Sequence, residues 1–379
     1  DWQTSSIKTS TFTAESGKGY FCNTAGGSFE VDLPAGTAGA IVSIQDYNNT
    51  FDDNNLTVDP NGSEKINGGT AGGYVTLSTE GEGITLVYID STVGWRSIQD
   101  NVFADPGTIP SFVAATGGTV TTVCTNYKVH TFTGPGTFCV SSAGNAAGSN
   151  TISYMVIAGG GGGGDGAGSS TNGGGGGGAG GYREGRTPQC NTWTASPLNA
   201  PAGLPVTATG YPVVVGAGGA TNVSGSNSVF TGSSTITSAG GGGGGNGSCV
   251  AKPGSAGGSG GGHNTNPGSG AAGNTPPVSP PQGNPGGGGT SSYSGGGGGA
   301  TSAGEDGGSG ASGGGNGATS SINGTPTARA AGGDGGGASG PAGTPQTANT
   351  GNGAPRGGAP GNAGGTGGSG IVIIRYKFQ

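Results

Sequence analysis

The sequence predicts an all-β protein with almost no α-helix. We expect a small N-terminal β module, then a β-sandwich into which a bundle of polyglycine II-type helices is inserted. Three observations predict this fold. Glycine makes up 76 of the 212 residues in 159–370. Apolar segments at 152–158 and 371–378 flank that tract. The apolar spacing i, i+3, i+4, i+7 of an amphipathic helix is absent over three turns.

The charge distribution limits the partners. The formal net charge is −7, and residues 1–158 carry 14 acidic and 5 basic side chains. The glycine-rich tract is neutral, with five of each. Phosphate binding needs clustered Lys and Arg, so nucleic acid is not expected as a partner. An apolar run of 18 residues is also lacking, so no membrane insertion is expected. Because Asp1 is not an initiator Met, we expect a processed or truncated chain.

Residues 1–105 are expected to form the N-terminal β module. Period-two alternation at 28–33 and apolar runs at 40–44 and 84–89 predict strands, separated by Pro- and Gly-rich turns. The Asp- and Asn-rich stretch 46–59 lacks the central Gly and distal Glu of a calcium loop. Asx turns explain it more simply, so no metal is predicted.

Residues 106–123 are expected to be a linker and strand lead-in, and residues 124–379 a glycine-rich domain. Strands are predicted at 128–133, 137–141, 152–158, 212–215, 235–238 and 371–376. They place a β-sandwich in 124–158, parts of 205–240, and 371–379. The terminal strand 371–376 should pair with 154–157, because both segments are apolar enough to be buried on two faces. The glycine tract would then be a closed insertion.

The tract itself is predicted to form packed extended helices with three residues per turn, which need no apolar core. Glycine permits neighbouring chains to approach until N–H···O and Cα–H···O bonds form. Glycine recurs at 358, 361, 364, 367 and 370, which fits one face of such a helix. Strict Gly-X-Y repetition over the tract is absent, which disfavours a collagen triple helix.

Five cysteines leave two alternatives open. Cys124 and Cys139 flank a hairpin expected over 123–140 and would close a disulfide there, while Cys190 and Cys249 form a second candidate pair. Cys22 would then be left over. Alternatively, all five are thiols in a protein assembled in a reducing compartment.

No catalytic constellation is apparent, so a non-enzymatic protein without a cofactor is predicted. Matches to GxGxxG recur throughout the tract and carry no information. The sequence 257–261 fits GxSxG but lacks a strand-then-helix context. The two histidines suggest no triad, and His130 is expected at a strand surface.

Binding is better supported than catalysis. Tyr and Trp give a large contact area at low entropic cost. The candidates in the tract are Tyr182, Trp193, His263 and Tyr293, of which Trp193 and Tyr293 are the better ones for an exposed tip. The alternative for each is packing within its loop.

Two sets of motifs resemble bacteriophage tail-fibre proteins. "YFCNTAGGSFEVDLPAG", "ITLVYID" and "VGW" resemble the small β modules of these fibres over residues 15–98. "HTFTGPGTFCV", "ISYMVIAGGGGGG", "GYPVVVGAGGA" and "GGSGIVIIRYKF" are similar to the glycine-rich domain of phage tail-fibre and adhesin proteins, over 127–379.

The resemblance implies a β-sandwich that seeds glycine-rich helices, whose connecting loops touch a bacterial surface glycan or outer-membrane protein. The protein would then lie in the virion tail, beside other copies of itself or other tail proteins. The alternative is a structural subunit of a self-assembling extracellular filament, because edge strands are templates for pairing.

Overall fold

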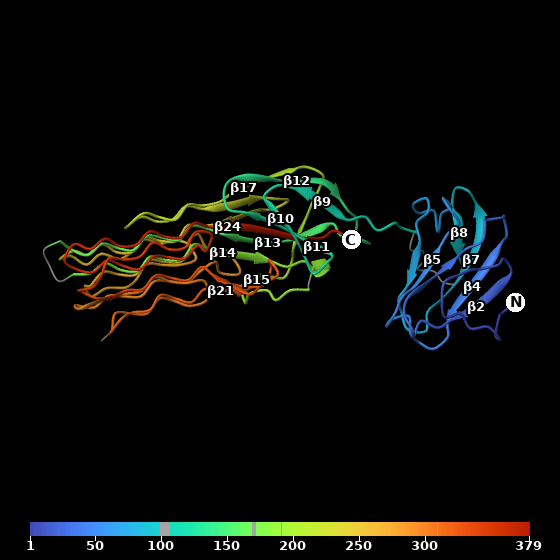
Figure 1. The fold of residues 1–379 in the computed structure, drawn as a ribbon, viewed down its shortest axis with the longest axis horizontal. Coiled ribbons are helices and arrows are strands. Elements are labelled where there is room, and N and C mark those ends of the chain that lie inside the picture. The colour runs from blue at the N-terminus through green and yellow to red at the C-terminus, as the bar shows by residue number, and fades with distance from the viewer. Residues whose placement is uncertain (99–106, 169–171, 191, 309) are drawn as a thin grey trace. The chain divides into compact units, whose positions relative to one another are not determined.

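The chain folds into two compact units, Asp1–Pro110 and Ser111–Gln379. The computed structural model describes residues 1–379 except 99–106, 169–171, 191 and 309 (Figure 1). In the described part of the chain, the one helical element is the 3₁₀ turn Pro188–Cys190. No helix there is therefore long enough to cross a membrane. The predicted all-β fold is confirmed.

The N-terminal unit consists of two four-stranded sheets. One has the order β1-β3-β5-β6 and the other β2-β4-β7-β8. Pairing is parallel for β1 with β3, β3 with β5 and β2 with β4, and antiparallel for the rest. The strands are β1 (Phe12–Thr13), β2 (Lys18–Cys22), β3 (Phe29–Asp32), β4 (Ile41–Asp46), β5 (Leu56–Asp59), β6 (Val75–Leu77), β7 (Gly83–Asp90) and β8 (Gly94–Ser97).

Alternating burial builds the core of this unit. In β4, Val42 and Ile44 are buried while Ile41 is exposed, so the period-two pattern points one face inward. Trp95 of β8 is fully buried and packs edge-on against Tyr88, with its indole N–H donating to Glu64.

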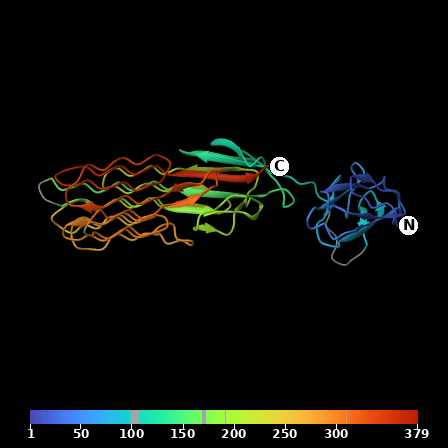
Figure 2. The same ribbon diagram turned by 60° about the horizontal axis from the view of Figure 1, so that its bottom comes forward.

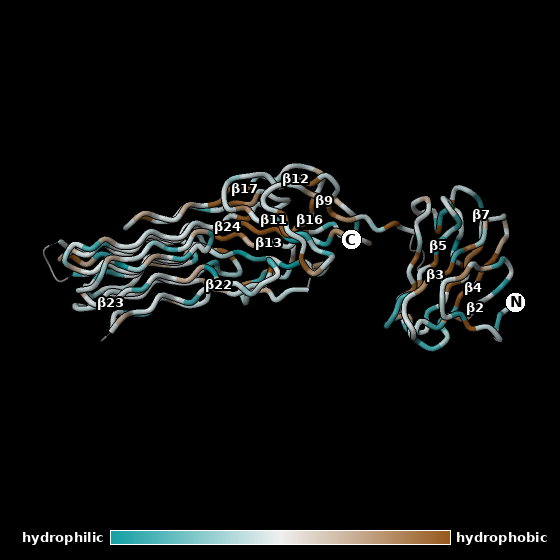
Figure 3. The backbone as a smooth tube through the Cα atoms, in the orientation of Figure 1, coloured by the Kyte–Doolittle hydropathy of each residue, from teal (hydrophilic) through white to brown (hydrophobic). Residues whose placement is uncertain are grey.

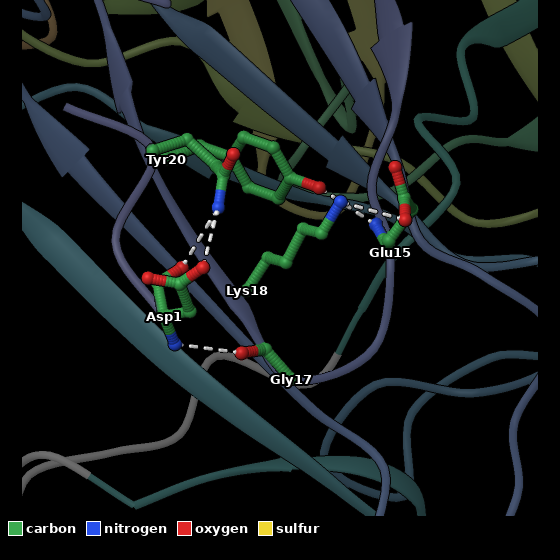
Figure 4. A network of polar contacts seen from close by, with 6 residues as sticks. Asp1, Glu15, Gly17, Lys18 and Tyr20 are labelled. Carbon is green, nitrogen blue, oxygen red and sulfur yellow. Dashed lines mark hydrogen bonds and ion pairs between the residues drawn. The ribbon is translucent and has the colours of Figure 1, made fainter. Parts of the chain in front are cut away.

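The N-terminus is tied to the first strands of the unit (Figure 4). The Asp1 amino group donates to the Gly17 carbonyl at 2.8 Å, and Lys18 pairs with Glu15 at 2.7 Å. The Glu15 amide donates to the Tyr20 hydroxyl at 2.9 Å.

The C-terminal unit is built on two packed sheets. The larger has the order β10-β11-β24-β13-β14-β15, with β16 also paired to β13, and the smaller has the order β19-β18-β17-β12-β9. One apolar core includes residues from both sheets, among them Phe138, Phe230 and Ile374. The strands are β9 (Val113–Thr116), β10 (Thr119–Val123), β11 (Tyr127–Phe132), β12 (Gly136–Ala143), β13 (Thr151–Ile157), β14 (Tyr182–Gly185), β15 (Asn199–Ala200), β16 (Leu204–Pro205), β17 (Gly210–Val214), β18 (Ser228–Thr231), β19 (Thr235–Ser238) and β24 (Ile371–Lys377).

The last strand is central to the larger sheet. β24 lies between β11 and β13, antiparallel to both, with Tyr154 opposite Ile374 and Ile157 opposite Ile371. Its residues 371–376 are all buried. The predicted pairing of 371–376 with 154–157 is confirmed, so the glycine-rich tract leaves and re-enters the sandwich on neighbouring strands.

The hairpin expected over 123–140 is wrong. β11 pairs with β10 and β24, whereas β12 pairs with β9 and β17 in the other sheet. The turn between β11 and β12 therefore crosses from one sheet to the other. Residues 106–123, expected as linker and strand lead-in, include β9 and β10.

Beyond the sandwich, the glycine-rich segments run side by side as extended chains (Figures 1 and 2). Residues 174–181 lie in the middle of this bundle. Their amides donate in rotation to three segments: Gly174 and Gly177 to 351–357, Gly175 and Gly178 to 239–245, and Gly176 and Ala179 to 295–298. Their carbonyls accept from 158–164, from 259–262 and from Gly333.

This rotation through three directions is the geometry of a helix with three residues per turn, as predicted for polyglycine II. None of residues 174–181 has a positive φ. A Cβ added to Gly176 would lie 2.0 Å from the Gly333 oxygen, and one added to Gly180 would lie 2.0 Å from the Ala158 oxygen. The glycine hydrogens that occupy this direction point at those carbonyls, as in Cα–H···O bonds.

The returning segment 362–370 shows why the glycine spacing is three. Gly364 and Gly367 face the carbonyls of Gly163 and Gly160, and Gly365 and Gly368 face those of Thr344 and Thr347. The third position of each turn is Ala363, Thr366 or Ser369, and none of these is buried. Gly361 differs from the expected packed face, because its φ is 65° and its nearest neighbour is 3.7 Å away, as in a turn.

Hydrophobic residues concentrate in the sandwich, while the bundle is polar to neutral (Figure 3). Where the two meet, alanine replaces glycine in the second apolar core of the unit. That core includes Ala179, Ala300 and Ala330 together with Met155, Ile157 and Ile373 from the larger sheet.

Candidate functional site

Loops from distant parts of the sequence come together at the end of the bundle away from the sandwich. We call this surface the loop end; it comprises residues 246–252, 264–270, 288–293, 336–341 and 358–362. Gly268 bridges to Gly289, Tyr293 pairs with Gly337, and Ser339 bridges to Ala359. The short strands β20 (Tyr293–Ser294) and β23 (Gly336–Gly337) pair with each other and so join the loops 288–293 and 336–341.

Side-chain amides tie the remaining loops to the same surface. Asn266 Nδ2 donates to the Ser248 carbonyl at 2.8 Å, and Asn172 Nδ2 donates to the same carbonyl at 2.7 Å. Val250, two residues after Ser248, is 66% exposed. The loops are therefore linked to each other as well as to the glycine chains below them, while keeping exposed side chains.

The predicted binding residues fall in different places. Tyr182, Trp193 and His263 are all buried. Trp193 packs in the second apolar core beside Arg186, so the expectation that it lies at an exposed tip is wrong. Tyr293 is half-buried and belongs to the loop end. Of the four candidates, it is the one placed to meet a partner.

Tyr182 belongs to a buried polar cluster around the carboxylate of Glu184. That carboxylate accepts hydrogen bonds from the Tyr182 hydroxyl at 3.1 Å, the Ser196 amide at 2.9 Å and the Ser320 hydroxyl at 2.5 Å. Burial, followed by the charge of Glu184, raises the pKa of Tyr182. These hydrogen bonds join β14 to the loop that contains Ser196 and to the short strand β21 (Ala318–Ser320), so the cluster positions both segments beside the sheet.

His263 is placed under the loop end without reaching its surface. The side chain is 2% exposed, and Nδ1 lies 3.0 Å from the Asn264 carbonyl. Gly268 and Gly289 pack directly on the ring, where an added Cβ would come within 3.0 Å. His263 therefore supports two of the loops.

All five cysteines lie within the described residues and are free thiols. Cys124 lies just after the end of β10 and Cys139 in β12 of the opposite sheet, so the sheet crossing between β11 and β12 separates the first predicted pair. Cys190 is buried, and burial raises its thiol pKa. Cys249 is exposed at the loop end.

A pocket at the bundle surface beside the loop end contains an arginine that the sequence analysis did not select. The pocket holds about 260 Å³ and is lined by Asp334, Gly335, Pro341, Ala342, Gly343, Thr344, Pro355 and Arg356. Nε and Nη1 of Arg356 are buried and have no hydrogen-bond partner in the described part of the chain. Nη2 donates to the Ser339 carbonyl at 3.4 Å. Burial lowers the pKa of Arg356.

The sequence contains a feature that could have singled out Arg356 as a candidate binding residue. Arg356 is one of five basic residues in the 212-residue tract, and it follows a proline in a segment otherwise made of small residues.

The N-terminal unit contains an acidic cluster of Glu30, Asp32 and Asp59, whose carboxylate oxygens lie within 4.8 Å of one another. Asp32 and Asp59 are directly opposite on β3 and β5. The pKa of Glu30 is raised, first by its hydrogen bond to Asp32 and then by burial and the neighbouring negative charges. The pKa of Asp59 is also raised, first by burial and then by the negative charge of Asp32. Asp59 is the last residue of the Asp- and Asn-rich stretch 46–59. At the start of that stretch, Asp46 Oδ2 accepts from the amides of Thr50, Phe51 and Gly81, which closes a turn.

His130 is buried, contrary to the expected strand surface. Nδ1 lies 2.7 Å from the Gly117 carbonyl and Nε2 lies 3.1 Å from the Tyr376 hydroxyl. Because a carbonyl only accepts, Nδ1 carries the proton and Nε2 accepts from Tyr376. Burial lowers the pKa of His130.

We therefore expect the C-terminal unit to lose stability in mild acid. The neutral ring is favoured by folding, so this stability is fully present above the ordinary pKa of about 6.5 and is lost as the pH falls through the lowered folded-state value. Hydrogen exchange of β11 and β24 peptides, measured from pH 8 to pH 5 and corrected for intrinsic exchange, should show falling protection. His130→Gln should reduce this pH dependence; an unchanged dependence would contradict the assignment.

An all-β sandwich that holds a lattice of glycine chains, with linked loops at its end, defines the class of this protein. A family model described as a glycine-rich domain matches residues 133–377, which include most of the sandwich strands and the whole lattice. The chain belongs to this glycine-rich domain family. No curated protein matches it.

Proposed function

We propose that the chain is a non-catalytic adhesin of the phage tail-fibre or tail-tip type. Its loop end would bind a bacterial surface glycan or outer-membrane protein, and the protein would lie in the virion tail. The observation that carries this proposal is the joining of separate loops into one surface above the glycine lattice. The resemblance of both units to tail-fibre sequences points to the same function.

The lattice suits this function for a physical reason. Ordering loops on binding costs free energy, and loops that are already held lose less. Hydrogen bonds along every chain hold the base of each loop, while the loop side chains stay free to vary. Tyr293 offers an aromatic ring at this surface, and its neighbours Ser291 and Ser292 are exposed.

A cell-binding assay tests the proposal. Labelled full-length protein should bind saturably to some members of a panel of bacterial strains. The double variant Ser291→Glu/Ser292→Glu should weaken this binding at least tenfold, because two new charges would sit at the loop end. The matched control is Ser233→Glu/Ser234→Glu, a second exposed serine pair in the β18–β19 turn of the sandwich. Equal binding by both variants, or no binding to any strain, would overturn the proposal.

A filament subunit is the second candidate, and the edge strand β10 favours it. Among the described strands β10 pairs with β11 alone, its first four residues are exposed, and Val120 is 43% exposed. An open edge of this kind can accept a strand from another copy. An average particle mass, measured by light scattering, that rises with protein concentration in the parent but not in Val120→Lys would support a filament.

A further inference from the structure

Arg356 is a cation without a protein counter-ion. Among the described residues, no carboxylate lies within ion-pair distance of its guanidinium. The nearest acidic group in its pocket, Asp334, uses Oδ1 to accept the Gly314 amide at 2.9 Å. Removing a charge from water without a partner is unfavourable, and each buried unpaired donor adds a cost of its own.

The guanidinium fits among its neighbours because the residues that adjoin it are glycines, which have no side chains. A Cβ added to Gly336 or Gly340 would lie 3.0–3.1 Å from Nη2, and one added to Gly173 would lie 3.4 Å from Nη1. Three segments thus meet at this side chain through glycine. A small neutral residue could occupy this position, as glycine, alanine and serine do elsewhere in the lattice. The packing of the lattice therefore does not require an arginine here.

The pocket beside Arg356 combines features that fit one class of ligand. The planar guanidinium fork suits a carboxylate or phosphate. Asp334 and the Thr344 hydroxyl can exchange hydrogen bonds with alcohol groups, and Pro341 and Pro355 offer apolar surface to a ring. A volume of about 260 Å³ is slightly below the roughly 300–1,000 Å³ of pockets for drug-sized ligands, and therefore fits a single sugar residue.

We propose that this pocket binds one acidic sugar residue, with Arg356 holding its carboxylate or phosphate and Asp334 accepting from its hydroxyls. The inference deepens the proposed adhesin function and rests on it, because it makes an anionic surface polysaccharide the receptor class. Nη2 makes one long hydrogen bond, to the Ser339 carbonyl at 3.4 Å, which a bond to a ligand oxygen can replace.

Binding of defined sugars tests the pocket without any bacterium. We would titrate the full chain with galacturonate, glucose 6-phosphate, glucose and inorganic phosphate, using calorimetry or NMR. At least one acidic sugar should bind, glucose should bind at least tenfold more weakly, and inorganic phosphate should bind more weakly than the better acidic sugar. Galacturonate and glucose 6-phosphate separate a carboxylate from a phosphate ligand. No binding of either acidic sugar, or equal binding of glucose, would overturn the inference.

Variants separate the arginine from general charge. Arg356→Gln should weaken acidic-sugar binding at least tenfold, and Arg356→Lys should weaken it partly, since Lys keeps the charge but loses the fork. The control Arg96→Gln makes the same change at an exposed arginine of β8 in the N-terminal unit and should leave binding unchanged. Arg356→Gln should also raise the melting temperature, because a half-buried charge with two buried, unpaired donors is lost. Equal losses in the Arg356→Gln and Arg96→Gln variants would contradict the assignment.

The cell assay then distinguishes the two proposals. If the parent and Arg356→Gln bind cells equally well, the acidic-sugar inference fails while the adhesin proposal stands. If the parent binds no strain, the adhesin proposal fails. The inference that the Arg356 pocket binds a bacterial surface polysaccharide then fails as well. Binding to cells that is lost in Arg356→Gln and retained in Arg96→Gln supports both proposals.

Discussion

Deleting residues 371–379 should unfold the C-terminal unit and not merely shorten it. The deletion removes β24, which separates β11 from β13 in the larger sheet and contributes to both apolar cores. Truncating one buried Ile to Ala costs about 2–5 kcal/mol, whereas whole domains are stable by about 5–15 kcal/mol. Three buried isoleucines, Ile371, Ile373 and Ile374, would be lost together.

Limited proteolysis and hydrogen exchange measure this outcome. In the deletion variant, peptides from β11, β13 and the glycine tract should exchange within the earliest time points, while β4 and β7 of the N-terminal unit stay protected. Removing Gln379 alone is the control, because this residue is exposed and lies beyond β24. Protease resistance of the glycine tract after the larger deletion would show that the lattice does not depend on the closing strand.

Replacing Gly176 with alanine should destabilise the lattice, although no apolar contact is lost. The new methyl carbon would lie 2.0 Å from the Gly333 oxygen and 2.7 Å from the Gly297 nitrogen, so neighbouring chains must separate. Each buried backbone group left unpaired costs about 1–3 kcal/mol, and at least two are affected. We therefore expect a loss of roughly 2–6 kcal/mol in the free energy of unfolding.

The matched control is Gly308→Ala, because a Cβ there would have no atom within 4 Å. Alanine at a tolerant glycine position stabilises by roughly 0.4–1 kcal/mol through the unfolded chain. An alanine scan over 363–369, read by melting temperature, should show two sensitive positions and one tolerant position in each turn. Gly364 and Gly365 should be sensitive and Thr366 tolerant. A flat profile would mean that the tract is a flexible linker.

The candidate site was less predictable than the fold, since aromatic residues were chosen as binding candidates by type. Tyr182 is buried because it lies in β14 of the larger sheet, and Trp193 is buried because the loop that carries it folds back on that sheet; both pack in the core that contains Met155 and Ile373. Nothing in the local sequence distinguishes that packing from an exposed tip. Arg356 was overlooked because its significance lies in what surrounds it: a pocket and the absence of a counter-ion.

The sequence by itself determined the all-β class, the position of the closing strand and the three-residue period of the glycine chains. These follow from local properties, namely apolar runs of strand length and a residue without a Cβ at every close approach. Only the tertiary structure decided which strands share a sheet, as with β11 and β12, and which loops meet at the loop end. Both depend on hydrogen bonds between segments far apart in the chain. In a tract where most residues are glycine, many different pairings of segments would satisfy the same local pattern.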